Sequence, residues 1–493
     1  MCACLKSEPP ICSIPKLAAV NPRRFDRVAC LEVMECLLSR KRDQFFYPTH
    51  DASSTACLLT HSIGPDHIIP FSLRRRVRSF VNDSAVIHLS NMTEQLRHFR
   101  IDSFLPAYRS SIPMELWART HSLHLLSPSA RLQRRLEDKV RFDRILRAHA
   151  VPAPQSQILA TVADSNAVHR YPLVLQTAHS EGGEGTYLVR SRDELHERLA
   201  NPKSTYPMLT REFICGPAFG VTLVVGDQDL LISSVRGQCI DLERRGSGLF
   251  GIQWLATGHF SPRLRASMDA TFALLGRVLR AEGFRGAASI DFMVDGEQVL
   301  VIECNPRFSA ATPQLSLQPS LLHGLDFATE YVRALTGARL GGDLPFVPES
   351  SYQGCCVDFG DWITPQLRAI NLRRVGGMPR IGVYEMSPEA PQFAGHDTEP
   401  LRFVSENVAD VSGADRLLFH YSTTTGSRIG SKSDLGSLIV NFPMFDFSND
   451  AAHLTARGDS LLHALQRQVA GKKNLRPHLA AQATVAAVVA AAH

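Results

Sequence analysis

The chain has 493 residues, of which 44% are hydrophobic and 20% are charged, and its formal net charge is +5. This length is enough for two to four packed domains, and the composition is ordinary for a soluble globular protein. The positive charge is too weak to indicate a nucleic-acid-binding protein. No stretch approaches about 18 consecutive apolar residues, so we expect no transmembrane helix.

The 11 cysteines are scattered and contain no pair of CxxC motifs, which argues against a zinc site. They fit a reduced cytoplasmic protein with free thiols. Residues 1–16 lack the long apolar core of a secretory signal. Residues 479–493 form an alanine-rich tail, for which we expect a frayed helix or disorder, with a membrane anchor as the alternative.

Short apolar runs between residues 51 and 127 alternate with helix-like stretches, a pattern typical of a small α/β domain. Apolar residues then recur at helical spacing over residues 131–150, and the following prolines end that helix. Residues 171–176 predict a buried strand. A capping box at residues 191–194 predicts the start of a helix that runs to about residue 199.

More strands are expected after residue 200. The predicted elements are three strands over residues 208–214, 219–225 and 229–240, an amphipathic helix over 263–282, a hairpin over 287–294 and 298–304, and helices over 319–335 and 460–469. Asp295 and Gly296 would form the hairpin turn. Two consecutive glycines at 341 and 342 mark a boundary.

A glycine-rich segment, residues 178–186, lies between two predicted strands. Gly182, Gly183 and Gly185 let backbone N–H groups turn toward an anion without interference from a Cβ atom. The segment therefore predicts a lid over a triphosphate, with an ordinary glycine-rich turn as the alternative. No Gly-Lys-Ser/Thr follows and no helix opens after it, which excludes a Walker A loop and a dinucleotide fingerprint.

Three residues with oxygen ligands, Asp291, Glu303 and Asn305, lie in the otherwise apolar hairpin. Charged groups there need a partner or a cation, and Mg²⁺ is commonly held by one or two carboxylates plus substrate phosphates. Side-chain alternation puts Glu303 and Asn305 on one face. Asp291 joins them only with a three-residue turn or a β-bulge, so the metal hypothesis predicts one of these. The alternative is two ordinary edge-strand carboxylates. Cys304, between apolar strand neighbours, is expected to be a buried thiol.

Two basic residues are further candidates. Arg307 follows Asn305 closely, and its guanidinium could hold a phosphate or carboxylate through two hydrogen bonds, with a surface salt bridge as the alternative. Lys139 is the only lysine between Lys41 and Lys203. It precedes the glycine-rich segment at the start of a helix, so it is a candidate phosphate ligand, with a solvated lysine as the alternative.

The order of these parts resembles the ATP-grasp superfamily over roughly residues 130–340, and looks most like its carboxylate–amine ligases. The motifs that carry the resemblance are residues 136–139, 151–154, 171–175, 182–186, 211–216, 289–292 and 302–307. The closing segment, with Asp291, Glu303 and Asn305, is the most specific.

The resemblance implies a mixed α/β and α+β fold, an ATP-grasp fold with a small α/β domain before it and a C-terminal extension. The implied domains are residues 1–130, the ATP-grasp subdomains 131–206 and 207–340, a C-terminal domain 341–478, and the tail 479–493. ATP would lie between the two subdomains.

The resemblance also implies roles for single residues. Asp291, Glu303 and Asn305 would hold Mg²⁺ or Mn²⁺, and Arg307 would act in catalysis by steadying the acyl phosphate or the incoming carboxylate. The residues implied in ATP binding are Lys139, Gly182, Gly183, Gly185 and Thr186 at the phosphates, and Gln176, Glu212, Phe213 and Ile214 near the adenine.

Two positions depart from the family. The second family lysine is Gln176 here, which can donate a hydrogen bond to adenine but cannot neutralise the α-phosphate. The acidic residue that often holds the ribose would fall near Ala218. Both changes favour a divergent substrate or a degenerate site.

The resemblance implies an ATP-dependent ligase that activates a carboxylate as an acyl phosphate and couples it to an amine, with release of ADP and phosphate. The alternatives are a non-catalytic nucleotide-binding regulator, favoured by the two departures, and a ligase with a thiol or carrier-protein acceptor. The expected partners are small-molecule carboxylates and amines, such as amino acids, without nucleic acid or membrane. A homo-oligomer stays open.

Overall fold

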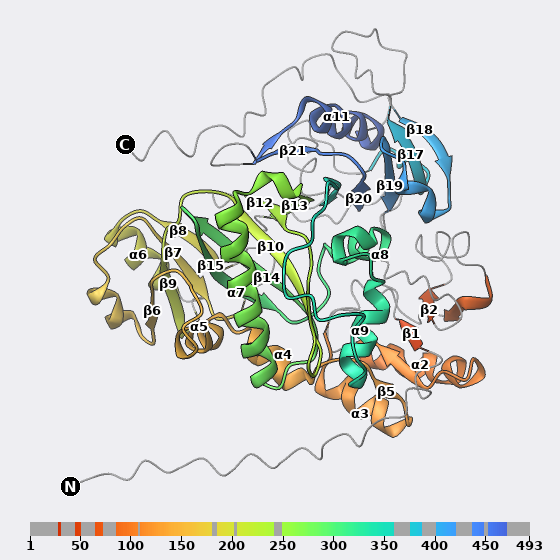
Figure 1. The fold of residues 1–493 in the computed structure, drawn as a ribbon, viewed down its shortest axis with the longest axis horizontal. Coiled ribbons are helices and arrows are strands. Elements are labelled where there is room, and N and C mark those ends of the chain that lie inside the picture. The colour runs from red at the N-terminus through yellow and green to blue at the C-terminus, as the bar shows by residue number, and fades with distance from the viewer. Residues whose placement is uncertain are drawn as a thin grey trace.

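The computed structural model describes residues 28–30, 45–50, 65–71, 85–106, 109–179, 185–201, 205–240, 249–358, 375–386, 401–420, 436–447 and 452–470 (Figure 1). No helix within these ranges is long and apolar enough to cross a membrane. Five cysteines in these ranges carry free thiols, as the scattered cysteine pattern predicts: Cys215, Cys239, Cys304, Cys355 and Cys356.

The N-terminal part is built on a five-stranded parallel sheet in the order β3-β2-β1-β4-β5. Its core includes Phe104 from a strand and Trp117 from a helix, and it agrees with the small α/β domain expected here. The elements are β1 (Val28–Cys30), β2 (Phe45–His50), β3 (Ile68–Phe71), α2 (Ala85–His98), β4 (Ser103–Leu105), α3 (Ile112–Thr120) and β5 (His124–Leu125).

The helix predicted over residues 131–150 is in fact two helices, α4 (Ala130–Glu137) and α5 (Lys139–Ala148). Asp138 separates them because its backbone is extended, at φ −66° and ψ 107°. Its carboxylate then accepts a hydrogen bond from the backbone N–H of Arg141, which caps α5. Lys139 is therefore the first residue of a new helix.

A four-stranded antiparallel sheet follows, in the order β6-β9-β7-β8. Its elements are β6 (Ser156–Leu159), β7 (Leu173–Thr177), β8 (Thr186–Val189), α6 (Arg192–Leu199) and β9 (Met208–Glu212). Ser191 caps α6 as expected, through the backbone N–H of Glu194. β9 belongs to this sheet, so the first subdomain continues past residue 206.

The largest sheet has 11 strands, in the order β15-β14-β10-β12-β13-β16-β20-β19-β17-β18, with β11 beside β10. Its strands up to residue 305 are β10 (Ala218–Val225), β11 (Leu230–Ile232), β12 (Arg236–Ile240), β13 (Leu249–Trp254), β14 (Gly286–Asp295) and β15 (Gln298–Asn305). β15 is one edge of this sheet and carries two of the three predicted metal ligands, Glu303 and Asn305.

The same sheet continues into the C-terminal part, because β16 pairs with β13. The remaining elements are β16 (Cys355–Asp358), β17 (Gly382–Met386), β18 (Leu401–Ser405), β19 (Arg416–His420), β20 (Ser437–Val440), β21 (Phe445–Asp446), β22 (His453–Leu454) and α11 (Ala456–Ala470). α11 agrees with the helix expected over residues 460–469.

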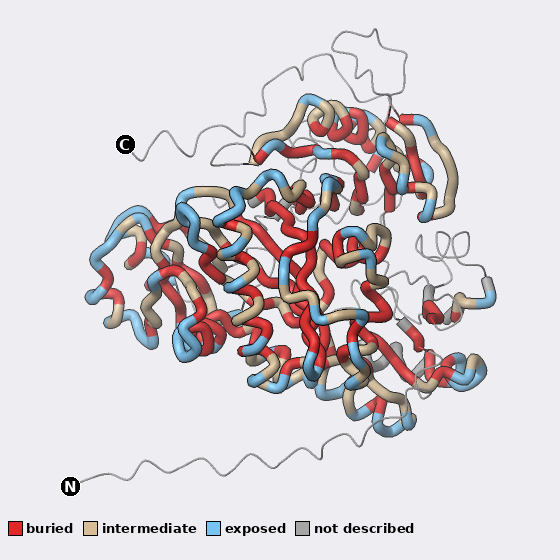
Figure 2. The backbone as a smooth tube through the Cα atoms, viewed as in Figure 1, coloured by how far each residue is buried: buried red, intermediate tan, exposed pale blue. Residues whose placement is uncertain are grey.

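Two helices cover opposite faces of the sheet at β10 and β14. α7 (Pro262–Ala281) packs on the face that carries Ile290 and Phe292, and α9 (Phe327–Thr336) packs on the face that carries Ala287. Most residues of the strands between them are buried, as Figure 2 shows. Because side chains alternate, Asp291 lies on the same face as Ala287.

Two predicted elements differ from the structure. The hairpin turn is Gly296-Glu297 rather than Asp295-Gly296, because Asp295 still pairs with Gln298 and Gly296 adopts the positive φ of +58°. The helix predicted over residues 319–335 is in fact a short 3₁₀ turn, Pro319–Leu322, followed by α9, and a further helix, α8 (Thr312–Leu317), precedes them. His323 at φ +54° interrupts the helical pattern there.

Candidate functional site

The β14–β15 hairpin contains the β-bulge that the metal hypothesis requires. The register shifts beside Asp291, so that this residue lies opposite Glu303. Val301 and Cys304 both pack into the core under α7, whereas unbroken alternation would put residues three apart on opposite faces. Ile302 is thus the extra residue, and it turns Glu303 to the face of Asp291. The predicted bulge is confirmed.

The two carboxylates are largely shielded from solvent, with 17% of the Asp291 side chain and 22% of the Glu303 side chain exposed. Burial and then the charge of Glu303 raise the pKa of Asp291 to about 7. Three groups act in the opposite direction, namely Arg236, Gln238 and Lys139. A cation between the carboxylates would offset their repulsion.

Two residues of β12 support Asp291, although no motif in the sequence pointed to them. The Nε2 atom of Gln238 donates to Asp291 Oδ1 at 2.7 Å, and the buried Arg236 places Nη2 4.0 Å from the same oxygen. Gly220 pairs with both Arg236 and Asp291. A Cβ atom there would lie 2.8 Å from Arg236 Cζ, so glycine leaves the space that the guanidinium occupies. Polar residues at alternate positions of an apolar strand were the available signal.

Asn305 has its amide turned away from the orientation that metal ligation needs. Its Oδ1 accepts from Arg307 Nη2 at 3.1 Å, and its Nδ2 lies 3.4 Å from Asp291 Oδ2. A ligand to Mg²⁺ must offer oxygen. Asn305 therefore joins a metal site only after its amide rotates, a rotation that ends the contact with Arg307.

Lys139 is buried beside the carboxylates rather than solvated. Its side chain is 3% exposed, and Nζ lies 3.2 Å from Glu303 Oε1. Its backbone N–H donates to the carbonyl of Ala178 at 2.9 Å, at the start of the glycine-rich segment. The solvated alternative is therefore wrong, and Lys139 lies between the predicted metal ligands and the predicted lid.

The donor set fits magnesium. Within the described ranges, no group of three His, Cys, Asp or Glu side chains could hold a metal ion. The candidate set is instead two carboxylates and one amide, which suits Mg²⁺ because this ion keeps several waters and takes further ligands from substrate phosphates.

The glycine-rich segment is only partly within the described ranges. Gly182 and Gly183 lie outside them. Gly185 has φ +71°, a value that favours glycine, and Thr186 begins β8. Gln176 is buried on β7, and its Nε2 donates to Thr186 Oγ1 at 3.3 Å. Its Oε1 has no partner among the described residues, so it can accept a hydrogen bond from a ligand.

Glu212, the last residue of β9, holds the neighbouring strand. Its Oε1 accepts from the backbone N–H of Gln155 at 2.8 Å, and its own N–H donates to the carbonyl of Gln155 at 2.9 Å. Phe213 and Ile214 follow β9 and are half-buried. The roles of these three residues at adenine remain predictions.

Arg211, next to Glu212, braces the bulge. Its Nη1 donates to the carbonyl of Ile302, the extra residue, at 2.6 Å. Its Nη2 lies 3.8 Å from Asp143 Oδ1, and both side chains are almost fully buried. Burial lowers the pKa of Arg211. The four-stranded sheet thereby contacts the edge strand that carries Glu303 and Asn305.

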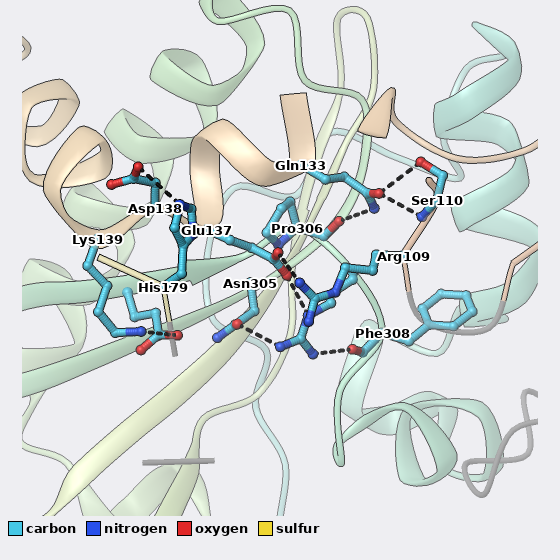
Figure 3. A network of polar contacts seen from close by, with 12 residues as sticks. Arg109, Ser110, Gln133, Glu137, Asp138, Lys139, His179, Asn305, Pro306 and Phe308 are labelled. Carbon is cyan, nitrogen blue, oxygen red and sulfur yellow. Dashed lines mark hydrogen bonds and ion pairs between the residues drawn. The ribbon is translucent and has the colours of Figure 1, made fainter. Parts of the chain in front are cut away.

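The guanidinium of Arg307 contacts three acceptor groups. Its Nε lies 2.6 Å from Glu137 Oε1, its Nη2 donates to Asn305 Oδ1, and its Nη1 donates to the carbonyl of Phe308 at 3.3 Å. Arg109 shares the same glutamate (Figure 3). The side chain of Arg307 is 9% exposed, so it is not an ordinary surface arginine.

The buried Lys139, which contacts both the carboxylate-bearing hairpin and the backbone of Ala178, fits the resemblance to the ATP-grasp fold. Residues 136–311 match the family model described as the ATP-grasp domain. Residues 136–311 of the chain therefore form an ATP-grasp domain.

A curated relative matches only part of this chain. The arginine-specific carbamoyl phosphate synthase large chain of Bacillus subtilis is 26% identical over 231 residues, which is 45% of this chain and 21% of that one. The chain thus spans about a fifth of the length of this curated relative.

Solved structures match almost the whole fold. A biotin carboxylase from Campylobacter jejuni, in complex with β,γ-ATP, superposes with a TM-score of 0.56 at 14% identity, over 86% of this chain and 89% of that one. The N5-carboxyaminoimidazole ribonucleotide synthetase PurK, in complex with ADP, gives 0.54 at 13% identity, over 90% and 98%. At these identities the likeness establishes the fold.

Proposed function

We propose that the protein is an ATP-dependent ligase, which activates a carboxylate as an acyl phosphate and couples it to an amine with release of ADP and phosphate. The observation that carries this proposal is the bulge that brings Asp291 and Glu303 together beside the buried Lys139. A buried carboxylate whose pKa is raised by a second carboxylate beside it has little use in a protein that transfers no phosphoryl group. Nucleotide-bound neighbours of the same fold support ATP as the phosphoryl donor.

Mg²⁺, or Mn²⁺ in its place, would be held by Asp291 and Glu303, with Asn305 after rotation of its amide. When bound, the ion offsets the negative charge that spreads over the transferring phosphoryl group. The charge of the Asp291–Glu303 pair and the acceptor-only chemistry of both groups fit this role.

Three parts of the chain would contribute to the transfer of the phosphoryl group. Lys139 supplies a buried positive charge beside the metal ligands and can offset the charge of a phosphate. Arg307, held rigidly at the end of β15, can steady the acyl phosphate or the incoming carboxylate through two hydrogen bonds. The glycine-rich segment would exclude water, which otherwise hydrolyses an acyl phosphate.

The names of the relatives support an enzyme of this kind. They are a carboxylase, a synthetase and a synthase. The substrates proposed for this chain are a small carboxylic acid or amino acid and a small amine, acted on in the cytoplasm.

A non-catalytic nucleotide-binding regulator is the second candidate. It is favoured by the uncharged Gln176 on β7 and by the apolar Ala218 at the start of β10. Both positions reduce the polar contacts available to ATP. The buried cluster of Lys139, Asp291 and Glu303 favours the ligase over this candidate.

The test is release of ADP from Mg-ATP in the presence of pairs of carboxylic acids and amines. We expect a subset of pairs to stimulate the wild type and none to stimulate Glu303→Gln, which removes one charge from the metal set. Glu297→Gln is the matched control, because Glu297 lies at the exposed turn of the same hairpin. If ATP binds but no pair stimulates ADP release by the wild type, the regulator is the better account.

A further inference from the structure

Helix α4 carries two polar residues, Gln133 and Glu137, on the face between the preceding domain and the end of β15 (Figure 3). Residues four apart lie on the same side of a helix. Each of these two side chains contacts one residue on either side of α4. The partners are consecutive in sequence on both sides, Arg109 and Ser110 before α4, and Pro306 and Arg307 after β15.

The Gln133 contacts are made by a neutral, buried amide. Its Oε1 accepts from the backbone N–H of Ser110 at 2.9 Å and from Ser110 Oγ at 3.0 Å. Its Nε2 donates to the carbonyl of Pro306 at 2.9 Å. The side chain is 2% exposed. Because a buried amide is costly to leave without partners, this bridge fixes the distance between residue 110 and residue 306.

The Glu137 contacts are charged. Oε1 lies 2.6 Å from Arg307 Nε, and Oε2 lies 3.1 Å from Arg109 Nη1. Both oxygens of one carboxylate are thus engaged, each by a different arginine. The exposed fractions are 11% for Glu137 and 9% for Arg307, so the bond between them is poorly screened by solvent.

Arg307 would depend on Glu137 most strongly with the proposed metal site occupied. Asn305 would give up its contact with Arg307 if its oxygen turned toward a cation, since one amide oxygen cannot serve both in this geometry. Glu137 then remains as the charged partner that fixes the plane of the guanidinium. An arginine without such a partner has several rotamers of similar energy.

We propose that Glu137 is a positioning residue that aims the guanidinium of Arg307 at the reacting carboxylate, and that Arg109 and Gln133 tie it to the preceding domain. This inference rests on the proposed ligase function. It gives the N-terminal domain a role in catalysis, because a shift of residues 109–110 moves the group that steadies the acyl phosphate. Arg307 touches the substrate, whereas Glu137 acts only through it.

The experiment compares Glu137→Gln with Glu115→Gln. Glu115, on α3, is the matched control. Its Oε1 accepts a hydrogen bond at 2.6 Å from the backbone N–H of Ala130, the first residue of α4, whereas Glu137 is the last residue of α4 and is the one that contacts Arg307. For Glu137→Gln we expect kcat to fall about 10-fold to 100-fold, the order expected for a misplaced catalytic group, with the KM for ATP within about twofold. Arg109→Met should lower kcat by a smaller factor, and Glu115→Gln should leave it within about twofold.

A second measurement does not depend on activity. Unfolding by urea is followed for Glu137→Gln, Arg307→Met and the double variant, where non-additive effects report the contact. The same cycle with Glu115 and Arg307 should be additive. If no variant and not even the wild type releases ADP, the proposed function fails while the cycle still reports the contact. Additive effects of Glu137 and Arg307, or an equal loss of kcat in Glu115→Gln, would overturn the inference.

Discussion

Replacing Asp291 with asparagine should stabilise the metal-free protein while abolishing its activity. The carboxylate lies opposite Glu303 in a largely buried position, and its pKa is raised from 3.8 to about 7. At roughly 1.4 kcal/mol per pKa unit, ionised Asp291 costs the folded state about 4 kcal/mol above pH 7. Asparagine removes that charge and keeps an oxygen for Gln238. Its new amide N–H faces Asn305, which we expect to reduce the net gain to about 1–3 kcal/mol.

The sign of this effect depends on pH. The pKa of Asp291 is higher in the folded state than in the unfolded chain. The folded wild type is therefore most stable at a pH below the unfolded pKa, where Asp291 is protonated in both states. Its free energy of unfolding falls as the pH rises from there to about 7. Asp291→Asn lacks this dependence. The stability difference should therefore be near zero at about pH 4, grow with pH, and level off above about pH 7.

The assay is urea unfolding in chelator, followed by the fluorescence of tryptophan, since Trp254 is buried in the same sheet. Asp295→Asn is the control, because Asp295 lies exposed at the end of the same strand, and it should change stability by less than about 0.5 kcal/mol. Added Mg²⁺ should stabilise the wild type and leave Asp291→Asn unchanged. A variant that is no more stable than the wild type at pH 8 in chelator would refute the reasoning.

Three further predictions concern the same site. The affinity for Mg²⁺ with a non-hydrolysable ATP analogue should rise as pH passes upward through about 7, since Asp291 must lose its proton to bind the ion, and calorimetry that shows no such rise would contradict this. Arg211→Met should cost about 1–3 kcal/mol in urea unfolding, because the Ile302 carbonyl loses its donor while Asp143 keeps Arg147 at 2.8 Å, and it should weaken Mn²⁺ binding through the Ile302 bulge. Unaltered Mn²⁺ affinity would show that Arg211 does not support the bulge. Gln176→Lys should tighten ATP binding about threefold to tenfold at low salt and less at high salt, and equal affinities would place Gln176 away from the phosphates.

The sequence predicted the parts of the molecule that depend on local pattern. The capped helix α6, the long helix α7 and the strands β10, β14 and β15 follow from periodicity and capping. The need for a bulge followed from alternation and from the assumption that Asp291 and Glu303 share a face.

Other features depend on contacts between distant segments and could not be predicted locally. Asp138 ends one helix and caps the next, although its neighbours continue a helical pattern. The sequence gives no sign that Arg236 and Arg211 are buried. Gly220 leaves space for the guanidinium of Arg236, and the carbonyl of Ile302 accepts a hydrogen bond from Arg211. Glu137 lies in the motif of Lys139, but its two arginine partners are 28 and 170 residues away in the sequence, so no local pattern predicts their contacts.

The central claim, that a carboxylate attacks the γ-phosphorus of ATP, is tested most directly by isotope transfer. The carboxylic acid that best stimulates ADP release is labelled with ¹⁸O in its carboxylate and incubated with the protein, Mg-ATP and the amine. An acyl phosphate passes one labelled oxygen to phosphate when the amine displaces it, so we predict one ¹⁸O atom in the released phosphate for each ADP formed. ADP release with unlabelled phosphate would mean that water or another group attacks ATP, and would contradict the account.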